Sequence, residues 1–129
     1  METVKEYIKI ADDDLESAVA LFNNKMYNTC VQHCAQAAEK YLKSFIFENG
    51  DLSHKKIMRS HDVGEIYLVC LELGLSSFDS DVVNVLDNLH GYYRTRYPAG
   101  ADLEITEENA EEAIKIVNIV KDKINGVIS

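Results

Sequence analysis

Residues 26–49 read MYNTCVQHCAQAAEKYLKSFIFEN and carry apolar side chains at an alternating spacing of four and three residues. This spacing is the period of one face of an α-helix, so the segment predicts a long amphipathic helix. Its length would be roughly 36 Å at 1.5 Å per residue, and Gly50 is a natural stop. Leu42 and Ile46 widen a stripe that consists of Tyr27, Val31, Cys34, Ala38, Tyr41 and Phe45.

The preceding segment, residues 3–24, repeats the same rhythm, and the pair Asn23-Asn24 marks a turn between the two segments. A link this short makes the two helices antiparallel neighbours. The acidic run from Asp12 to Asp14 lies largely off the apolar stripe, so we expect it to face solvent. The stripe consists of Val4, Ile8, Ala11, Leu15, Ala18 and Phe22.

A polar connection over residues 50–61 follows the second helix and leads to a third, short helix over about 62–73. Ser60 is a suitable cap for this helix, and Asp62 is favourable in its first turn because a carboxylate there meets the positive end of the helix dipole. Gly74 ends the segment.

The fourth helix is expected over about residues 80–96, because Pro98 disfavours helical backbone at the residue before it. Thr106 then caps a fifth helix, whose apolar residues recur at helical spacing to about residue 124. No segment alternates apolar and polar residues at period two. The sequence therefore predicts an all-α fold, an up-and-down antiparallel helical bundle of about five helices, as a single domain over residues 1–129.

The composition limits the classes of function. With 47% hydrophobic residues, the 129-residue chain can bury a core without a disulfide or a metal. An odd number of cysteines, no secretory leader and no run of about 20 apolar residues predict a cytoplasmic protein outside the membrane. The formal net charge is −9, whereas proteins that bind nucleic acid non-specifically are usually basic. Any anion site must therefore be local.

The cations are concentrated in the middle of the chain. In an up-and-down bundle, the end of the second helix, the start of the third and the end of the fourth lie at the same pole. This pole would therefore be basic, and it would also hold His61. Such a local field can attract an anion even to an acidic protein. The alternative is that these cations cap helix ends and pair with neighbouring acids. They are Lys40, Lys43, Lys55, Lys56, Arg59, Arg94 and Arg96.

The stretch YYRTRYP, residues 92–98, combines two arginines with three tyrosines at a helix terminus. Arginine binds phosphate in a bidentate manner, and tyrosine offers a stacking face and a hydroxyl group. This combination suits a nucleotide or an RNA end. The alternative is a packed helix stop in which the arginines pair with Glu39 or Asp62.

Catalytic and metal-binding motifs are not found. Cys30 and Cys34 lie four residues apart with His33 between them, but a structural zinc site needs four ligands and no second pair has motif spacing. We expect both cysteines in the core, His33 on the surface, and neither a metal nor a cofactor. The motifs of nucleophilic hydrolases, P-loops and dinucleotide-binding folds are absent.

Three short motifs together resemble a known family: QAAEKYLK at residues 36–43, SHDV at 60–63 and RYP at 96–98. In order and spacing they are similar to those of the HEPN domain, the nucleotide-binding domain of higher eukaryotes and prokaryotes, in its small stand-alone prokaryotic form. The resemblance covers nearly the whole chain. It implies an all-α bundle, often a homodimer, and in many members a partnership with a minimal nucleotidyltransferase in a toxin–antitoxin pair.

The resemblance also implies a site. Several branches of the family are metal-independent ribonucleases with an Arg and a His separated by four to six residues. That spacing is absent after Arg59, Arg94 and Arg96, which argues against an enzyme and assigns no catalytic residue. What remains is a candidate site for a nucleotide or polynucleotide phosphate, in which Glu39 would orient Arg96. Its ligand-binding candidates are Lys40, Lys43, His61, Arg94, Arg96 and Tyr97.

Three functions therefore stay open. The first is a module that binds a nucleotide or RNA phosphate and a minimal nucleotidyltransferase. The second is a ribonuclease toxin with a non-standard site, in which His61 or His90 pairs with Arg94 or Arg96. The third is a purely structural protein that dimerises through its apolar faces.

Overall fold

The computed structural model describes residues 3–93 and 104–128, except for the side chains of His90, Tyr92 and Tyr93. The described residues form α-helices and two short 3₁₀ helices and contain no strand, which confirms the predicted all-α helical bundle. None of these helices combines the length and the apolar composition needed to cross a bilayer. The elements are α1 (Val4–Asn23), α2 (Tyr27–Asn49), η1 (Leu52–His54), η2 (Ile57–Arg59), α3 (Val63–Glu72), α4 (Ser80–Tyr93) and α5 (Glu107–Val127).

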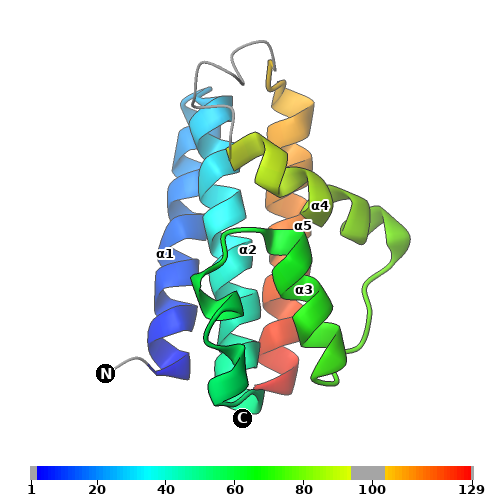
Figure 1. The fold of residues 1–129 in the computed structure, drawn as a ribbon. Coiled ribbons are helices and arrows are strands. Elements are labelled where there is room, and N and C mark those ends of the chain that lie inside the picture. The colour runs from blue at the N-terminus through cyan, green and yellow to red at the C-terminus, as the bar shows by residue number, and fades with distance from the viewer. Residues whose placement is uncertain (1–2, 94–103, 129) are drawn as a thin grey trace.

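Three long helices form the body of the molecule (Figure 1). As predicted, α1 and α2 are an antiparallel pair. Helix α5 lies beside α2 and runs in the same direction as α2, whereas the predicted up-and-down order would make these two helices antiparallel. The connection over residues 50–61 climbs back along α2 through η1 and η2 before α3 begins. Helix α3 therefore runs in the same direction as α2, where the sequence predicted alternating directions, and α4 crosses obliquely.

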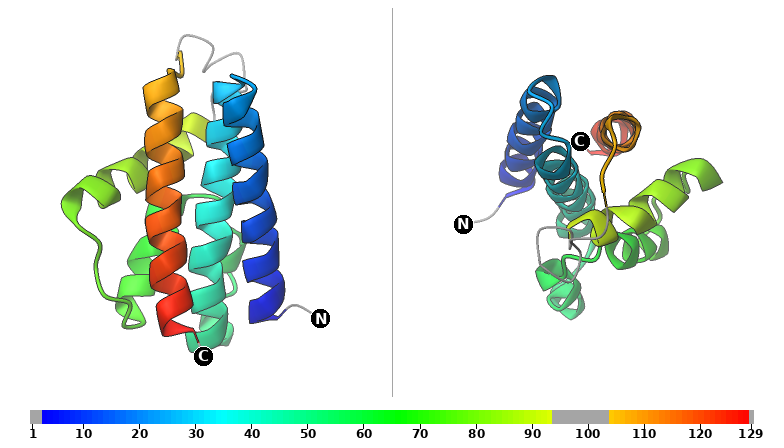
Figure 2. Two further views of the ribbon diagram at one scale, coloured as in Figure 1. Left: turned by 180° about the vertical axis from the view of Figure 1, so that it is seen from behind. Right: turned by 90° about the horizontal axis from the view of Figure 1, so that it is seen from above.

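Helix α2 is the centre of the bundle (Figure 2, right). The other four α-helices pack against it. Its middle is buried on nearly every side, whereas the periodicity predicted a stripe on one side. Small side chains make this possible because they let neighbouring helices approach closely; they include Cys30, Cys34, Ala35, Ala37 and Ala38.

Side-chain caps define the starts of the α-helices α1, α3 and α5. The Asp62 carboxylate accepts a hydrogen bond from the Glu65 amide at 3.2 Å, so Asp62 is the N-cap of α3 and the predicted cap, Ser60, is not. The Ser60 hydroxyl instead accepts from the Asp62 amide at 3.0 Å, which shapes the turn before the helix. Thr3 caps α1, and Thr106 caps α5 as predicted.

Thr106→Ala should lower the free energy of unfolding by about 1 kcal/mol, the usual cost of losing an N-cap. The Thr106 hydroxyl accepts from the Asn109 amide at 3.1 Å, and the Asn109 side chain accepts from the Thr106 amide at 3.1 Å, so both bonds of a capping box are present. Urea unfolding followed by circular dichroism measures the effect. Thr106→Ser keeps the hydroxyl and should retain most of the stability; an equal loss for both variants would contradict the capping role.

Candidate functional site

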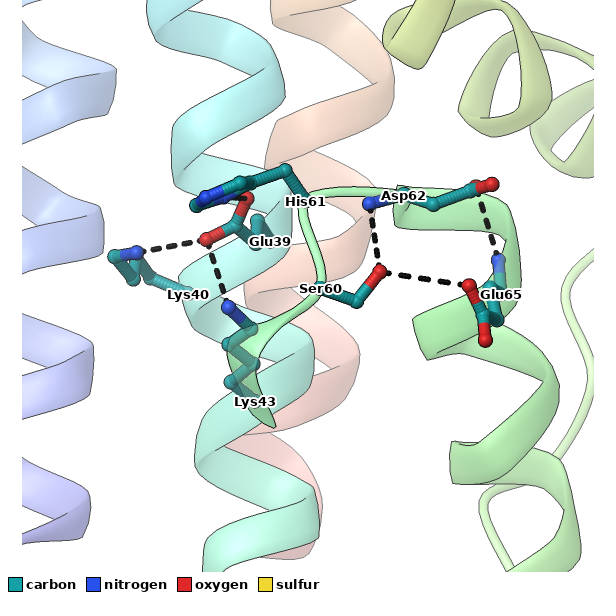
Figure 3. A network of polar contacts seen from close by, with 7 residues as sticks. All are labelled: Glu39, Lys40, Lys43, Ser60, His61, Asp62 and Glu65. Atoms are coloured by element: carbon teal, nitrogen blue, oxygen red, sulfur yellow. Dashed lines mark hydrogen bonds and ion pairs between the residues drawn. The ribbon is translucent and has the colours of Figure 1, made fainter. Parts of the chain in front are cut away.

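A buried carboxylate on α2 organises the candidate site (Figure 3). Glu39 is only 3% exposed. Its Oε2 accepts hydrogen bonds from Lys40 Nζ at 2.7 Å and from Lys43 Nζ at 3.0 Å. Its Oε1 lies 3.0 Å from Nδ1 of His61. We call these four residues the Glu39 network.

The local structure explains why these side chains meet. Lys43 lies one helical turn after Glu39, so both project from the same face of α2. His61 comes from the end of the connection that climbs along α2, directly before the Asp62 cap of α3. The capped start of α3 thus holds His61 against the middle of α2. Because an ionised carboxylate only accepts, the hydrogen bond to Glu39 places the ring proton on Nδ1 of His61.

The charges in the Glu39 network do not balance. Within the network, one carboxylate faces two ammonium groups, and the Asp14 carboxylate of α1 also interacts with the charge of Lys40. Burial would raise the pKa of Glu39, but the hydrogen bond from Lys40 and the charges of Lys43 and Lys40 outweigh it and lower that pKa. Lys40 and His61 are the members of the network that an anion in solvent can reach.

The lowered pKa of Glu39 predicts an acid-sensitive contribution to stability. Above the unfolded pKa of about 4.3 the carboxylate is ionised in both states, so its ion pairs contribute fully. As the pH falls through the lower folded pKa, Glu39 becomes protonated and the contribution disappears. The stability difference between wild type and Glu39→Gln should be largest above pH 5 and shrink below pH 4.

Urea unfolding at pH 7, 5 and 3.5 measures this difference. Glu16→Gln, at an exposed position on α1, is the matched control and should differ little from wild type at each pH. A gap between wild type and Glu39→Gln that stays constant from pH 7 to pH 3.5 would rule out the proposed linkage.

The described members of the predicted site differ in accessibility. The His61 side chain is 62% exposed and that of Lys40 is 26% exposed, so both can reach a ligand. The Lys43 side chain is only 4% exposed and its ammonium group points at Glu39. Lys43 therefore stabilises the Glu39 carboxylate and is not accessible to a ligand. The remaining candidates, Arg94, Arg96 and Tyr97, lie outside the described residues. The orientation of Arg96 by Glu39 therefore stays a prediction.

The site lies beside the middle of α2, whereas the sequence predicted a basic pole at the end of this helix. The reason is the path of residues 50–61, which carries His61 back from the end of α2. Of the described cations of this connection, Lys55 and Arg59 stay near that end, because they line a pocket together with Gly50, which follows the last turn of α2. Helix α4 finishes beside the half of α2 that is nearer to the α1–α2 turn, and not at the predicted pole.

Two polar contacts between α1 and α2 were not predicted. His33 was expected on the surface, but its Nδ1 lies 3.2 Å from Asp14, and both side chains are partly buried. Burial raises the pKa of Asp14, and the hydrogen bond with His33 opposes the shift. The Tyr41 hydroxyl donates to Asp12, so the acidic run is only partly solvated. Only the register of the two helices could have revealed these pairs.

The cysteines lie in the core as predicted. Cys30, Cys34 and Cys70 are fully buried free thiols. Among the residues that the structure describes, no group of three His, Cys, Asp or Glu side chains is arranged to hold a metal ion.

Comparison with known proteins identifies the family of the chain. The model of the HEPN domain family matches residues 4–127. The chain therefore belongs to the HEPN family, as its three short motifs suggested.

Particular relatives share sequence or fold with this chain. A protein of Methanocaldococcus jannaschii named "Putative toxin MJ1304" is 27% identical over 133 aligned residues, covering 92% of this chain and 86% of that protein. Two crystal structures share the fold: TT1696 from Thermus thermophilus, with a TM-score of 0.81, and ST0689, an archaeal HEPN homologue, with 0.73. They are 19% and 23% identical, and cover 99% and 100% of this chain and 100% of their own.

Proposed function

We propose that this HEPN protein binds the phosphate of a nucleotide or of RNA at the Glu39 network. The observation that carries the proposal is that two cationic or titratable side chains from different segments, Lys40 and His61, converge on one buried carboxylate while both remain accessible to solvent. Lys40 and His61 face solvent and would contact the phosphate, while Lys43 holds Glu39 in place. Arg94, Arg96 and Tyr97 would complete the site.

Titration calorimetry with ATP and GTP, together with fluorescence anisotropy of a labelled single-stranded RNA, tests this proposal. Lys40→Ala and His61→Ala should each weaken binding about tenfold, equivalent to about 1.4 kcal/mol. Lys115→Ala removes an exposed lysine on α5, distant in the chain from the network, and serves as the control. Binding should also weaken as salt rises, because counterions released from a polyanion drive part of the affinity. Absence of binding, or equal losses for all three variants, would contradict the proposal.

A second candidate function is RNA cleavage, and the pair His61–Glu39 is the observation that favours it. A carboxylate that holds Nδ1–H of a histidine orients the other ring nitrogen, as in sites where histidine is a general base. Incubation of the protein with tRNA and mRNA tests for this activity. Cleavage that His61→Ala abolishes would support a ribonuclease; intact RNA would leave phosphate binding alone.

We further propose that the chain is one half of a toxin–antitoxin pair in the cytoplasm, with a minimal nucleotidyltransferase as its partner and a homodimer as its own state. The family membership and the name of the Methanocaldococcus jannaschii relative support this proposal. Co-expression with a minimal nucleotidyltransferase should yield a complex. Sedimentation of the isolated chain as a strict monomer would contradict the dimer.

A further inference from the structure

A second surface lies at the end of α2 and uses no residue of the Glu39 network. A pocket of about 680 Å³ opens between the first turns of α1, the last turn of α2 and the connection that contains η1 and η2. Its lining combines apolar side chains with cationic ones. The residues that matter below are Phe47, Leu52, Met58, Lys55 and Arg59.

The apolar part of this pocket is unusually exposed. Phe47 is 43% exposed and Leu52 is 80% exposed, so both large side chains lie open to water in the isolated chain. Tyr7 supports Phe47 from α1, with ring centroids 5.6 Å apart and ring planes inclined by 48°. Exposed apolar side chains around a hollow are typical of a surface that a partner covers.

The charged part of the pocket is unbalanced. Lys55 and Arg59 are exposed, and within residues 3–93 and 104–128 neither side chain makes an ion pair or a hydrogen bond. The acid at the rim, Asp51, is already engaged: its carboxylate accepts from the Ser53 amide at 2.8 Å and from the Ser53 hydroxyl. These bonds lower the pKa of Asp51. The lowered pKa keeps Asp51 ionised, so two cations face one carboxylate in the pocket lining, which is an excess of positive charge on a protein of net charge −9.

We propose that this pocket docks an acidic segment of a partner protein that carries a large apolar side chain. The apolar side chain would enter between Phe47, Leu52 and Met58, and the carboxylates beside it would meet Lys55 and Arg59. A peptide fits this lining better than a nucleobase does. Leu52 and Met58 offer no flat face, and the inclined rings of Tyr7 and Phe47 do not form a stacking platform.

Selection of a random peptide library on the whole protein, followed by anisotropy with the selected synthetic peptide, tests the charged half of the proposal. The selected peptides should be rich in Asp and Glu around one Leu, Phe or Trp. Lys55→Glu and Arg59→Glu should each weaken binding at least tenfold. Lys56→Glu makes the same charge change at an exposed neighbour outside the pocket lining and should change affinity less than threefold.

A matched pair of leucine-to-serine variants tests the apolar half of the proposal. Leu52→Ser should weaken binding of the peptide at least fivefold. Leu68→Ser, at a 59% exposed position on α3, should leave the affinity for the peptide unchanged. All five side chains are exposed, so circular dichroism should show each variant folded. The proposal fails if the peptides lack acidic residues, if the matched variants behave alike, or if selection yields no binder. It also fails if single-stranded RNA displaces the peptide, or if Leu52→Ser dissolves a dimer of the chain, since the pocket then serves nucleic acid or a second copy.

Discussion

Glu39→Met should destabilise the protein by about 3–5 kcal/mol, the range observed when one partner of a buried ion pair is removed. The substitution removes the carboxylate that the Lys43 ammonium group contacts at 3.0 Å, and the Lys43 side chain is only 4% exposed. The main cost is that the buried Lys43 ammonium group loses its contact with the Glu39 carboxylate, because the Lys40 side chain is already partly exposed to water. Urea unfolding at pH 7, followed by circular dichroism, measures the change.

The double variant Glu39→Met/Lys43→Met distinguishes the ion pair from general packing. Replacing both charges with apolar groups of similar length removes the buried charge, and such replacements are often neutral or stabilising by about 1–4 kcal/mol. We therefore expect the double variant to be more stable than Glu39→Met alone. A double variant that is less stable than either single variant would show that packing, and not charge, dominates at this position.

Leu42→Ala should cost about 2–5 kcal/mol, the range for removing a large aliphatic side chain from a packed core. Leu42 is fully buried on α2. The Leu42 carbonyl accepts a hydrogen bond from the Cys70 thiol at 3.4 Å, so Leu42 lies where α3 packs against α2. A rigid helix surrounded by its neighbours cannot collapse into the space that the truncation leaves, so the cavity persists.

Leu68→Ala is the matched control for this truncation. Leu68 is 59% exposed on α3, so the same chemical change there should alter the free energy of unfolding by no more than about 0.5 kcal/mol. Urea unfolding of both variants under the same conditions gives the comparison. Similar losses at positions 42 and 68 would contradict the central position of α2.

Positions 39 and 42 show that the candidate site and the core share one helix. Glu39 and Lys43 lie among the buried residues of α2, so variants at either position test folding as well as binding. Lys40 and His61 are the better probes of function because their side chains reach solvent. A phosphate that binds there would be held by groups whose positions the core already determines.

Much of this protein follows from the sequence alone. The alternating spacing around Val31 and Tyr41 predicts α2 to within one residue, because a helix with one apolar face can bury it only at that period. Thr106 predicts the start of α5, since its hydroxyl satisfies an amide that the first turn leaves without a partner. The small, apolar character of Cys30 and Cys34 predicts their burial.

Only the tertiary structure decides how those helices create a site. His61 meets Glu39 across 22 residues of chain because the connection after α2 turns back along it, and neither helical period nor capping chemistry encodes that path. The burial of α2 on nearly every side likewise depends on four neighbours packing at once. Local sequence determines which face of a helix is apolar, whereas the position of each charge in low or high dielectric depends on contacts that are distant in sequence.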